Sequence, residues 1–508
     1  MQSVRRERLG RAAKRSASER PVERMKPIRR RIPTVNLLSE DEVERIHNAS
    51  MEILEEVGIE FRDAIALKDW KTAGADVDGS RVRIDRHLLM ELLERAPSAF
   101  QMGGRDPARD FTMGGDTVVF CPMKGAPYTR DITGVRRSTS EQDLINFARL
   151  TQALPSFHIG GGFVCEPMDL PVPHRHFAFN YHHLVETELP YFGIATSRER
   201  AEDSIAMAKI VHGAERMQEV ATIAGHISGN SPLVWDQAML DGLRVFAEAG
   251  QVVLCSPFVL GAANTPADVA ATVAQLNAEA VAAIAYAQIV RPGARTIYGQ
   301  YTVSISMQSG APMAGTPEVA LITTAVGQLA RKYRLPWRTT GSHASSKSFD
   351  AQSGYESATS MMTGMNAGAN LMLHCGGWDE GGLTICYAKF IADAEQNVLL
   401  GRYAEGISFD RFDEALAAVR RIGPGGHYLG DSFTLEHFRQ AFSMPKEMDF
   451  SSYEQWMANG ARDMAERCRA KAASLLREFV APPIDPGVRE ELDEFVTKRK
   501  SAIDPRVM

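Results

Sequence analysis

The chain has 508 residues, of which 44% are hydrophobic and 24% charged, a balance typical of a globular protein with a large core. Its formal net charge of −6 offers no general attraction to nucleic acid or to a membrane surface. No stretch approaches the ~20 uninterrupted apolar residues of a membrane helix, and the N-terminus lacks the apolar core of a signal peptide. The six cysteines stand singly, without a CxxC pair, so we expect reduced thiols in a cytoplasmic protein.

The first 33 residues differ in composition from the rest of the chain. Arg and Lys dominate from Arg5 to Arg31, and the segment ends at Pro33. No aromatic residue lies among these charges to stack on nucleic-acid bases. We therefore predict a flexible or subunit-wrapping tail over residues 1–33, with a nucleic-acid arm as the less favoured alternative.

Residues 34–116 predict a helical lead-in. Ser39 has the character of a helix N-cap, because three acidic residues follow it. The apolar residues from Val43 to Val57 recur at roughly helical spacing, and Gly58 ends the pattern. A shorter amphipathic helix is predicted over residues 86–95.

From Thr117 onward, short apolar runs alternate with helix-length stretches. Three of the predicted helices are 266–289, 316–333 and 350–367. Eight strand–helix units predict a closed (β/α)8 TIM barrel over 117–405, followed by a C-terminal helical extension over 406–508. The alternative, an open doubly wound sheet, usually carries a GxGxxG after its first strand, and no run here provides one. The eight predicted strands are 118–120, 157–164, 191–196, 220–227, 252–259, 296–302, 336–341 and 370–375.

In such a barrel the functional residues lie where the strands end. The predicted strand ends are rich in glycine, histidine and aromatic residues, and poor in carboxylates. They carry Met123, Tyr128, Phe163, Glu166, Ser197, His226, Asn230, Phe258, Gln300, Tyr301, Ser342, His343, His374 and Trp378.

Signatures of metal and nucleophilic catalysis are missing from the sequence. There is no HExxH, no paired CxxC and no GxSxG. Among the clustered histidines at 174, 176, 182 and 183, positions 176 and 183 are seven apart and could share a helix face, but we interpret the cluster as part of a solvated or hydrogen-bonded helix and predict no metal site.

A mouth lined by aromatic rings, with few acids or bases, suits a substrate that needs holding more than proton transfer. A quaternary ammonium fits, because aromatic faces attract cations and its leaving group is a neutral amine. The alternative is that Phe163, Phe258 and Tyr301 simply fill the barrel.

Several segments resemble the trimethylamine methyltransferase family, including its members without pyrrolysine such as the glycine betaine corrinoid methyltransferases. Each segment alone is weak, but together they run in order along most of the chain. They are 38–42 (LSEDE), 53–59 (ILEEVGI), 277–279 (NAE), 309–312 (SGAP), 350–356 (DAQSGYE), 423–430 (GPGGHYLG) and 452–456 (SYEQW).

This resemblance implies that a methyl group passes from a methylated amine to the Co(I) of a corrinoid. The corrinoid, a cobalamin-type cofactor, is expected on a separate protein that caps the barrel mouth. The nearest approach to its DxHxxG binding pattern, Asp85 to Met90, lacks the glycine, so this chain is not expected to bind the cofactor itself. Because no pyrrolysine is present, a quaternary amine such as glycine betaine is favoured over trimethylamine.

The resemblance and the strand-end pattern together give candidate site residues. The predicted cage for the methylated nitrogen is Tyr128, Phe163, Phe258, Tyr301 and Trp378. Three residues are available to hold a substrate carboxylate, Lys347, Arg338 and His343, although Lys347 could equally be a solvated loop lysine.

Three residues are candidates for catalytic roles. His343 is placed to touch the substrate carboxylate or the axial ligand of the cobalt, whereas Gln352 and Glu380 are expected to line the mouth near the corrinoid. The structural alternative for Gln352 and Glu380 is a helix-cap or loop contact. For Asp350 we prefer the role of a helix cap.

Other functions remain open from the sequence. The same barrel could be a lyase or demethylase that uses no corrinoid, or a non-catalytic betaine-binding protein. An amphipathic, Met-containing stretch over residues 442–480 is compatible with a subunit contact in a homo-oligomer and with an ordinary helical cover.

Overall fold

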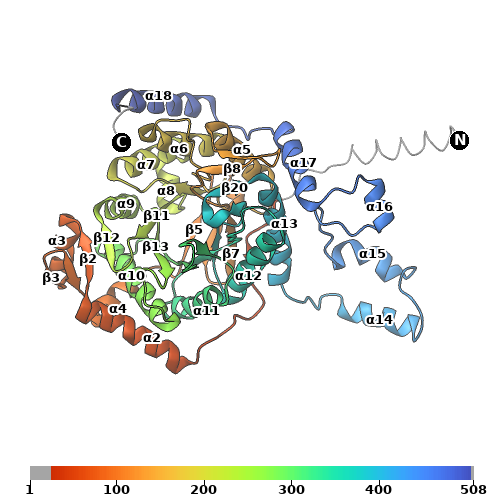
Figure 1. The fold of residues 1–508 in the computed structure, drawn as a ribbon, viewed down its shortest axis with the longest axis horizontal. Helices are drawn as coiled ribbons and strands as arrows, with labels where there is room; N and C mark the ends of the chain where they lie inside the picture. The colour runs from red at the N-terminus through yellow and green to blue at the C-terminus, as the bar shows by residue number, and fades with distance from the viewer. Residues whose placement is uncertain (1–23, 505–508) are drawn as a thin grey trace.

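The structure is a computed structural model and describes residues 24–504. At its centre lies a strongly curved sheet of parallel strands with helices packed around its outside (Figure 1). The mixed α/β class predicted from the sequence is confirmed, and seven of the eight predicted runs contain strands of this sheet. In hydrogen-bonded order the strands are β10 (Tyr191–Gly193), β11 (Ile223–Gly229), β13 (Val252–Gly261), β14 (Thr296–Gly299), β17 (Trp337–Thr340), β18 (Leu371–Leu373) and β7 (Thr117–Cys121).

The predicted strand over residues 157–164 was wrong. The segment is irregular. Only its first part lies beside β7, where the backbone N–H of His158 donates to the carbonyl of Phe120 at 3.0 Å. Gly162 has a φ of 66°, and a Cβ on it would lie 1.9 Å from the carbonyl oxygen of Phe192. Three consecutive glycines therefore allow a tight turn against the neighbouring backbone, which a regular strand could not make.

Helices follow the strands along the chain and cover the outer face of the sheet (Figure 1). Three of them match the predicted helices within a few residues: α10 (Val269–Val290), α11 (Pro317–Lys332) and α12 (Ala351–Ala367). Asp350 caps α12 as predicted, because its carboxylate accepts the backbone N–H of Ser353 at 3.0 Å. The others are α5 (Glu141–Ala153), α6 (Arg175–Glu186), α7 (Arg198–His212), α8 (Ala214–Glu219), α9 (Gln237–Glu248) and α13 (Tyr387–Ala404).

Helix α10 is buried along most of its length. By length and composition it could cross a membrane, but 83% of its most apolar 18-residue segment is buried inside the molecule. Its polar residue Asn277 is fully buried and satisfied: the side-chain amide donates to Ser50 and Tyr333 at 2.9 Å each, and accepts from Tyr298 at 3.0 Å. One side chain therefore ties α10 to the lead-in, to α11 and to β14.

The lead-in contains strands as well as the predicted helices. Ser39 and Glu42 form a capping box at the start of α2 (Glu40–Glu52), which continues as one π-helical turn (Ile53–Val57) to Gly58. The second predicted helix is α4 (Arg86–Glu94). Further elements are α3 (Ala64–Ala73), the four-stranded sheet of β12 (Val234–Asp236), β2 (Ile59–Arg62), β4 (Arg81–Arg83) and β3 (Asp76–Asp78), and the hairpin of β5 (Ala99–Met102) and β6 (Phe111–Gly114).

Shorter strands surround the carboxyl ends of the central sheet. They are β8 (Tyr128–Arg130), β9 (Arg136–Ser138), β15 (Tyr301–Ile305), β16 (Pro312–Met313), β19 (Trp378–Asp379) and β20 (Thr384–Cys386). At the opposite end, β1 (Ile28–Arg29) pairs antiparallel with the start of β7. β1 falls within the tail predicted as flexible, whose residues 1–23 lie outside the described part of the chain.

The C-terminal extension is helical and leaves the body of the molecule before returning to it. Helices α14 (Phe412–Ile422), α15 (Ser432–Ala441) and α16 (Tyr453–Ala458) stand to one side of the central sheet (Figure 1). Helices α17 (Met464–Arg477) and α18 (Pro486–Ala502) pack back onto the body, against α13 and α7 respectively.

Replacing Asn277 with Leu removes the buried amide and its three hydrogen bonds, and it leaves the Tyr298 hydroxyl without its acceptor. We expect the free energy of unfolding to fall by about 2–4 kcal/mol. The matched control is Asn48→Leu on the exposed side of α2, for which we expect a change below about 0.5 kcal/mol. Urea unfolding of both variants checks this, and equal effects would contradict the role assigned to Asn277.

Candidate functional site

Four aromatic rings meet at the carboxyl ends of the central strands, and we call them the aromatic cluster. Tyr301 begins β15, His343 and His374 follow β17 and β18, and Trp378 begins β19. The Trp378 ring centroid lies 4.4 Å from that of His343 and 4.3 Å from that of His374, and Tyr301 lies 5.1 Å from His343. All four side chains are buried. The fold therefore brings together residues as far apart in sequence as Tyr301 and Trp378, which are 77 positions apart.

The local backbone is shaped to hold these rings. Gly382 has a φ of 98°, and a Cβ there would lie 2.3 Å from the Trp378 indole, so a side chain is excluded. His374 adopts a φ of 71°, a left-handed conformation that costs a non-glycine residue on the order of 1–3 kcal/mol. The surrounding packing must supply that energy, as is common at binding sites.

One ring connects the cluster to the surface. Phe258 in β13 stacks on Tyr301 with a centroid distance of 4.8 Å and an interplanar angle of 12°. Its side chain is 43% exposed, whereas the rings behind it are buried. An approaching ligand would therefore meet Phe258 before it reached the interior.

Polar atoms in the cluster lack partners within the described residues. The indole Nε1 of Trp378, Nε2 of His343 and Nδ1 of His374 are buried and form no hydrogen bond. Burial, and then the nearby positive charge of Arg338, lowers the pKa of both His343 and His374 well below its usual value. Both imidazoles are therefore neutral at pH 7, and they leave hydrogen-bonding capacity that a ligand can use.

Two buried cations lie beside the aromatic cluster. Arg338 in β17 is fully buried, with its guanidinium carbon 6.0 Å from the Tyr301 ring centroid, and its Nε and one Nη have no partner. Lys124 follows β7, with its Nζ 3.4 Å from Nδ1 of His226 and 4.0 Å from the ring centroid of Phe192. Among the described residues, neither cation forms an ion pair with a carboxylate.

The absence of a counter-charge perturbs both groups. Burial lowers the pKa of Lys124 to about 7 and that of Arg338 to about 10, and these shifts are opposed by the Cys121 thiol for Lys124 and first by the Tyr301 hydroxyl for Arg338. Burial also lowers the pKa of His226 well below its usual value, with Lys124 adding to the effect. An anion bound beside either cation would offset the cost of its desolvation.

A second buried lysine nearby shows the ordinary solution to the same problem. Nζ of Lys389 in α13 lies 2.9 and 2.8 Å from the two carboxylate oxygens of Asp393. Asp393 also accepts the Ser342 hydroxyl at 2.7 Å and the backbone N–H of Gly377 at 2.8 Å. This ion pair therefore joins the two loops that carry His343 and Trp378, and it holds their rings in register.

The structure places four of the predicted site residues at the aromatic cluster and a fifth beside the buried Lys124. Tyr301, His343 and Trp378 belong to the aromatic cluster, and Phe258 stacks on it. Phe163 lies beside the buried cation instead, with its ring centroid 4.5 Å from Nζ of Lys124.

Four predicted residues make their contacts elsewhere. Tyr128 packs under the guanidinium of Arg136 at 3.8 Å, and Glu380 forms an ion pair with the same arginine at 2.8 Å. Lys347 is exposed and donates to the carbonyl of Ser345, whereas Gln352 is exposed on α12 and donates to Glu356.

Sequence reasoning missed Lys124 and Phe192. Lys124 comes three residues after β7, so the strand-end rule could have included it. No sequence signal indicates that its ammonium turns inward toward His226, 102 residues away.

The potential metal ligands and clustered histidines elsewhere in the described residues differ from this site. Within residues 24–504, no group of three His, Cys, Asp or Glu side chains could hold a metal ion. The histidines at 176, 182 and 183 have separate partners, which are Asp203, Glu141 and the Leu189 carbonyl.

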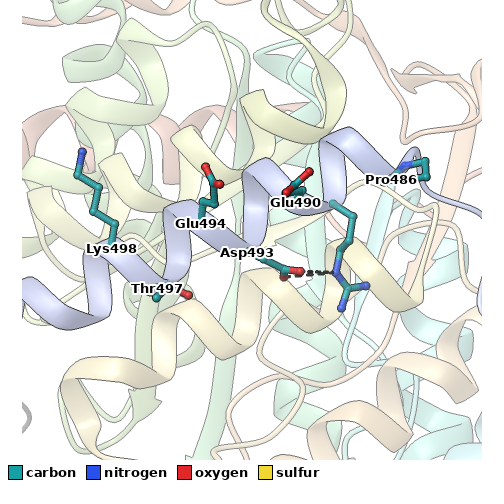
Figure 2. Close-up of a pocket in the computed structure, with 7 residues that line it drawn as sticks. Pro486, Glu490, Asp493, Glu494, Thr497 and Lys498 are labelled. Atoms are coloured by element: carbon teal, nitrogen blue, oxygen red, sulfur yellow. Dashed lines mark hydrogen bonds and ion pairs between the residues drawn. The ribbon is translucent and has the colours of Figure 1, made fainter.

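Figure 2 shows a shallow surface hollow along α18. Its residues all come from this one helix, and Arg489 and Asp493 pair with each other at 3.3 Å. Because these side chains face solvent, the hollow lacks the buried unpaired groups found at the aromatic cluster.

The family model and the similar sequences identify one family. The family model described as trimethylamine methyltransferase (MTTB) matches residues 5–504. The chain is 36% identical over 469 residues to a glycine betaine methyltransferase of Desulfitobacterium hafniense (strain Y51), covering 92% of this chain and 98% of the relative. It is 27% identical to the trimethylamine methyltransferase MttB of Desulfitobacterium hafniense (strain DSM 10664 / DCB-2), covering 90% and 92%. Among solved structures, the Methanosarcina barkeri monomethylamine methyltransferase (MtmB) aligns at 11% identity with a TM-score of 0.48, covering 91% of this chain and 96% of that one.

Replacing each of the two buried lysines with Met should change the free energy of unfolding in opposite directions. Lys124→Met removes an unpaired buried cation, so we expect the free energy of unfolding at pH 6 to rise by about 1–4 kcal/mol. The gain should shrink as the pH rises above about 7, because the folded-state ammonium then loses its proton while the unfolded one keeps it.

The matched control is Lys389→Met, which leaves the buried Asp393 carboxylate without its cation. We expect this variant to lose about 3–5 kcal/mol. Denaturant unfolding at pH 6 and pH 9 measures both effects, and a destabilising Lys124→Met would contradict the unpaired state of that lysine.

Proposed function

Because the chain belongs to the trimethylamine methyltransferase family, we propose that it moves a methyl group from glycine betaine or a related betaine to the Co(I) corrinoid of a separate protein. The observation that carries this proposal is the pair of unpaired buried cations, Lys124 and Arg338, beside a neutral aromatic cluster. A betaine has the complementary charges, a quaternary ammonium and a carboxylate. The 36% identical relative, a glycine betaine methyltransferase, supports the same substrate class.

Each end of the substrate has its own partners in this proposal. The trimethylammonium group contacts the faces of Tyr301 and Trp378 by cation–π attraction, with neutral His343 as a third wall. A protonated imidazole would repel the ammonium, so the lowered pKa of His343 serves binding. The carboxylate accepts from Nζ of Lys124 and from the free Nε and Nη of Arg338.

The proposed reaction is an in-line displacement at a methyl carbon. The carbon–nitrogen bond breaks and its electron pair stays on nitrogen, which leaves as a neutral tertiary amine. Co(I), the second substrate, supplies the electron pair of the new cobalt–carbon bond and is formally oxidised by two electrons. No proton is transferred, so the contribution of this chain is to position the methyl group and to exclude water.

The remaining fold and rim assignments belong to the same proposal. We propose that residues 157–160 close the curved sheet into a barrel, supported by the contact of His158 with Phe120 and by a bridge between Gly160 and Tyr191. The corrinoid protein would then cap the mouth, where Gln352 and Glu380 are candidate contacts, and the reaction would take place in the cytoplasm.

A trimethylamine-type activity is the second candidate, because the family also includes trimethylamine methyltransferases. Trimethylamine has no carboxylate, so it would leave the charges of Lys124 and Arg338 uncompensated. Of the two substrates, the buried cations therefore favour the betaine.

The direct test is methyl transfer to reduced Co(I) cobalamin by the purified chain, followed by absorbance. We expect methylated cobalamin from glycine betaine and little or none from trimethylamine. Transfer from trimethylamine in preference would overturn the substrate assignment. Binding of betaine without transfer, to free cobalamin or to a corrinoid protein, would identify a binding protein instead.

The variant Arg338→Met tests the contact with the substrate carboxylate separately from the contact with the ammonium group. Loss of one charged hydrogen-bond partner costs about 1.5–3 kcal/mol, so kcat/KM for glycine betaine should fall by about 10–150-fold. Tetramethylammonium, which lacks the carboxylate, should lose no kcat/KM, because the variant removes a charge that this donor leaves uncompensated.

Trp378→Leu is the matched variant at the other end of the substrate, and it should slow both donors. Equal losses for both donors in Arg338→Met would argue against the carboxylate contact.

A further inference from the structure

Asp379, which follows Trp378 in β19, is a buried acid whose charge has no partner. Its side chain is fully buried, and one oxygen, Oδ1, accepts the hydroxyl of Ser353 at 2.8 Å. Among the carboxyl oxygens of residues 24–504, its other oxygen, Oδ2, is the one that is buried without any hydrogen bond. Native proteins rarely leave such an atom unsatisfied, so a functional reason is expected.

The cations that influence Asp379 make their contacts with other groups. Lys389 of α13 forms its ion pair with Asp393 at 2.8 Å. The guanidinium of Arg130 in β8 donates to two backbone carbonyls of neighbouring loops. Within the described residues, Asp379 therefore forms no ion pair, although two positive charges are close enough to act on it.

The carboxyl of Asp379 titrates near neutral pH. Burial raises the pKa of Asp379 to about 7, whereas Lys389 and the hydrogen bond from Ser353 act in the opposite direction. Asp393 adds to the rise in this pKa, and Arg130 opposes it. Ser353 lies in the first turn of α12, where the helix dipole favours an anion. A further cation nearby would therefore convert Asp379 to the carboxylate.

The other titratable groups around Asp379 keep a fixed charge near pH 7. Burial raises the pKa of the Cys386 thiol on β20 to about 12, so this thiol stays neutral. Hydrogen bonds at the start of α12 hold the pKa of Asp350 below its usual value, and Glu380 is paired with Arg136 at 2.8 Å. Behind the aromatic cluster, the charge that changes near neutral pH is that of Asp379.

Asp379 lies behind the ring that is proposed to hold the ammonium group. Consecutive residues of a strand face opposite sides. The Trp378 indole accordingly packs on His343 and His374, whereas the Asp379 carboxyl faces α12. The carboxylate would therefore act on a ligand across the indole and not by contact. In a buried region of low dielectric constant, charges interact over such distances more strongly than in water.

We propose that Asp379 supplies the negative charge that favours binding of the quaternary ammonium group, as Lys124 and Arg338 supply the positive charge for the carboxylate. Asp379 is then a positioning residue, because it acts through Trp378 and does not touch the substrate. The inference rests on the proposed function, since it needs the ammonium group to lie against this indole. A zwitterion would thus complete a buried acid at one end and buried cations at the other.

The test uses tetramethylammonium, which has the cationic end of the proposed substrate and no carboxylate. Lys124 also titrates near pH 7 and would change the affinity for a cation in the same direction, so the full chain with Lys124→Met is the reference. Its dissociation constant for tetramethylammonium should fall by about 10-fold from pH 5.5 to pH 8.5, because Asp379 gains its negative charge over this range.

Adding Asp379→Asn to the reference removes the charge but keeps an oxygen that can accept the Ser353 hydroxyl. We expect affinity at pH 8.5 to fall by about 10-fold and the pH dependence to disappear. The matched control is Ser353→Ala, which loses the hydrogen bond and keeps the carboxyl. Because that bond lowers the pKa of Asp379, the midpoint of the pH dependence should move to higher pH. A merely structural contact would instead weaken binding equally at every pH.

Calorimetry of the reference protein gives a readout that needs no variant of Asp379. Because a bound cation favours the carboxylate, tetramethylammonium binding at pH 6.5 should release protons, measured in two buffers with different ionisation enthalpies. Binding without proton release, or a pH dependence that persists in Asp379→Asn, would overturn the role of Asp379 and leave the aromatic cage intact. No binding of tetramethylammonium at any pH would overturn the cage, and this inference with it.

Discussion

Two basic side chains, Lys124 and Arg338, lie inside the protein with no carboxylate opposite them among residues 24–504, and the proposed substrate assignment depends on this imbalance. Burying an unpaired cation costs several kcal/mol, and the depressed pKa of Lys124 reflects that cost. Lys389, which lies nearby, is equally buried but has Asp393 as its partner. In the same region of the protein, one buried lysine is paired with a carboxylate and the other is not, as expected where a ligand supplies the anion.

The neutral rings complete the electrostatic pattern. Tyr301, His343 and Trp378 present faces that attract a cation, and the histidines carry no charge that would oppose it. A zwitterion satisfies both halves at once, with its orientation set by its own dipole. Because Asp393 joins the loops that hold His343 and Trp378, the rings are fixed before the substrate arrives, which suits a displacement that depends on alignment.

Regular features of this fold could be predicted from the sequence, because they arise from local patterns. The alternation of apolar runs predicted eight strands, of which seven are present, and Ser39 and Asp350 were recognisable as helix caps. The segment 157–164 was misjudged, because its apolar residues have strand character while its glycines favour a tight turn.

The site was predictable only in part. The strand-end rule found Tyr301, His343 and Trp378, but it gives no distances across the sheet. Lys347 was a candidate donor for the carboxylate together with Arg338 and His343, and the structure places it on the surface. Lys124 follows β7, the first strand of the predicted barrel. It reaches the region of the aromatic cluster only through the curvature of the sheet, which no local pattern encodes.

Calorimetric titration of glycine betaine at pH 8, in two buffers with different ionisation enthalpies, tests the central claim most directly. Lys124, with a pKa of about 7, is mostly neutral at that pH, and a bound carboxylate favours its charged form. We predict net proton uptake on binding, approaching one proton per site, which disappears in Lys124→Met. Binding of betaine with no proton uptake, or the same uptake in the variant, would contradict the claim that this buried lysine receives the substrate carboxylate.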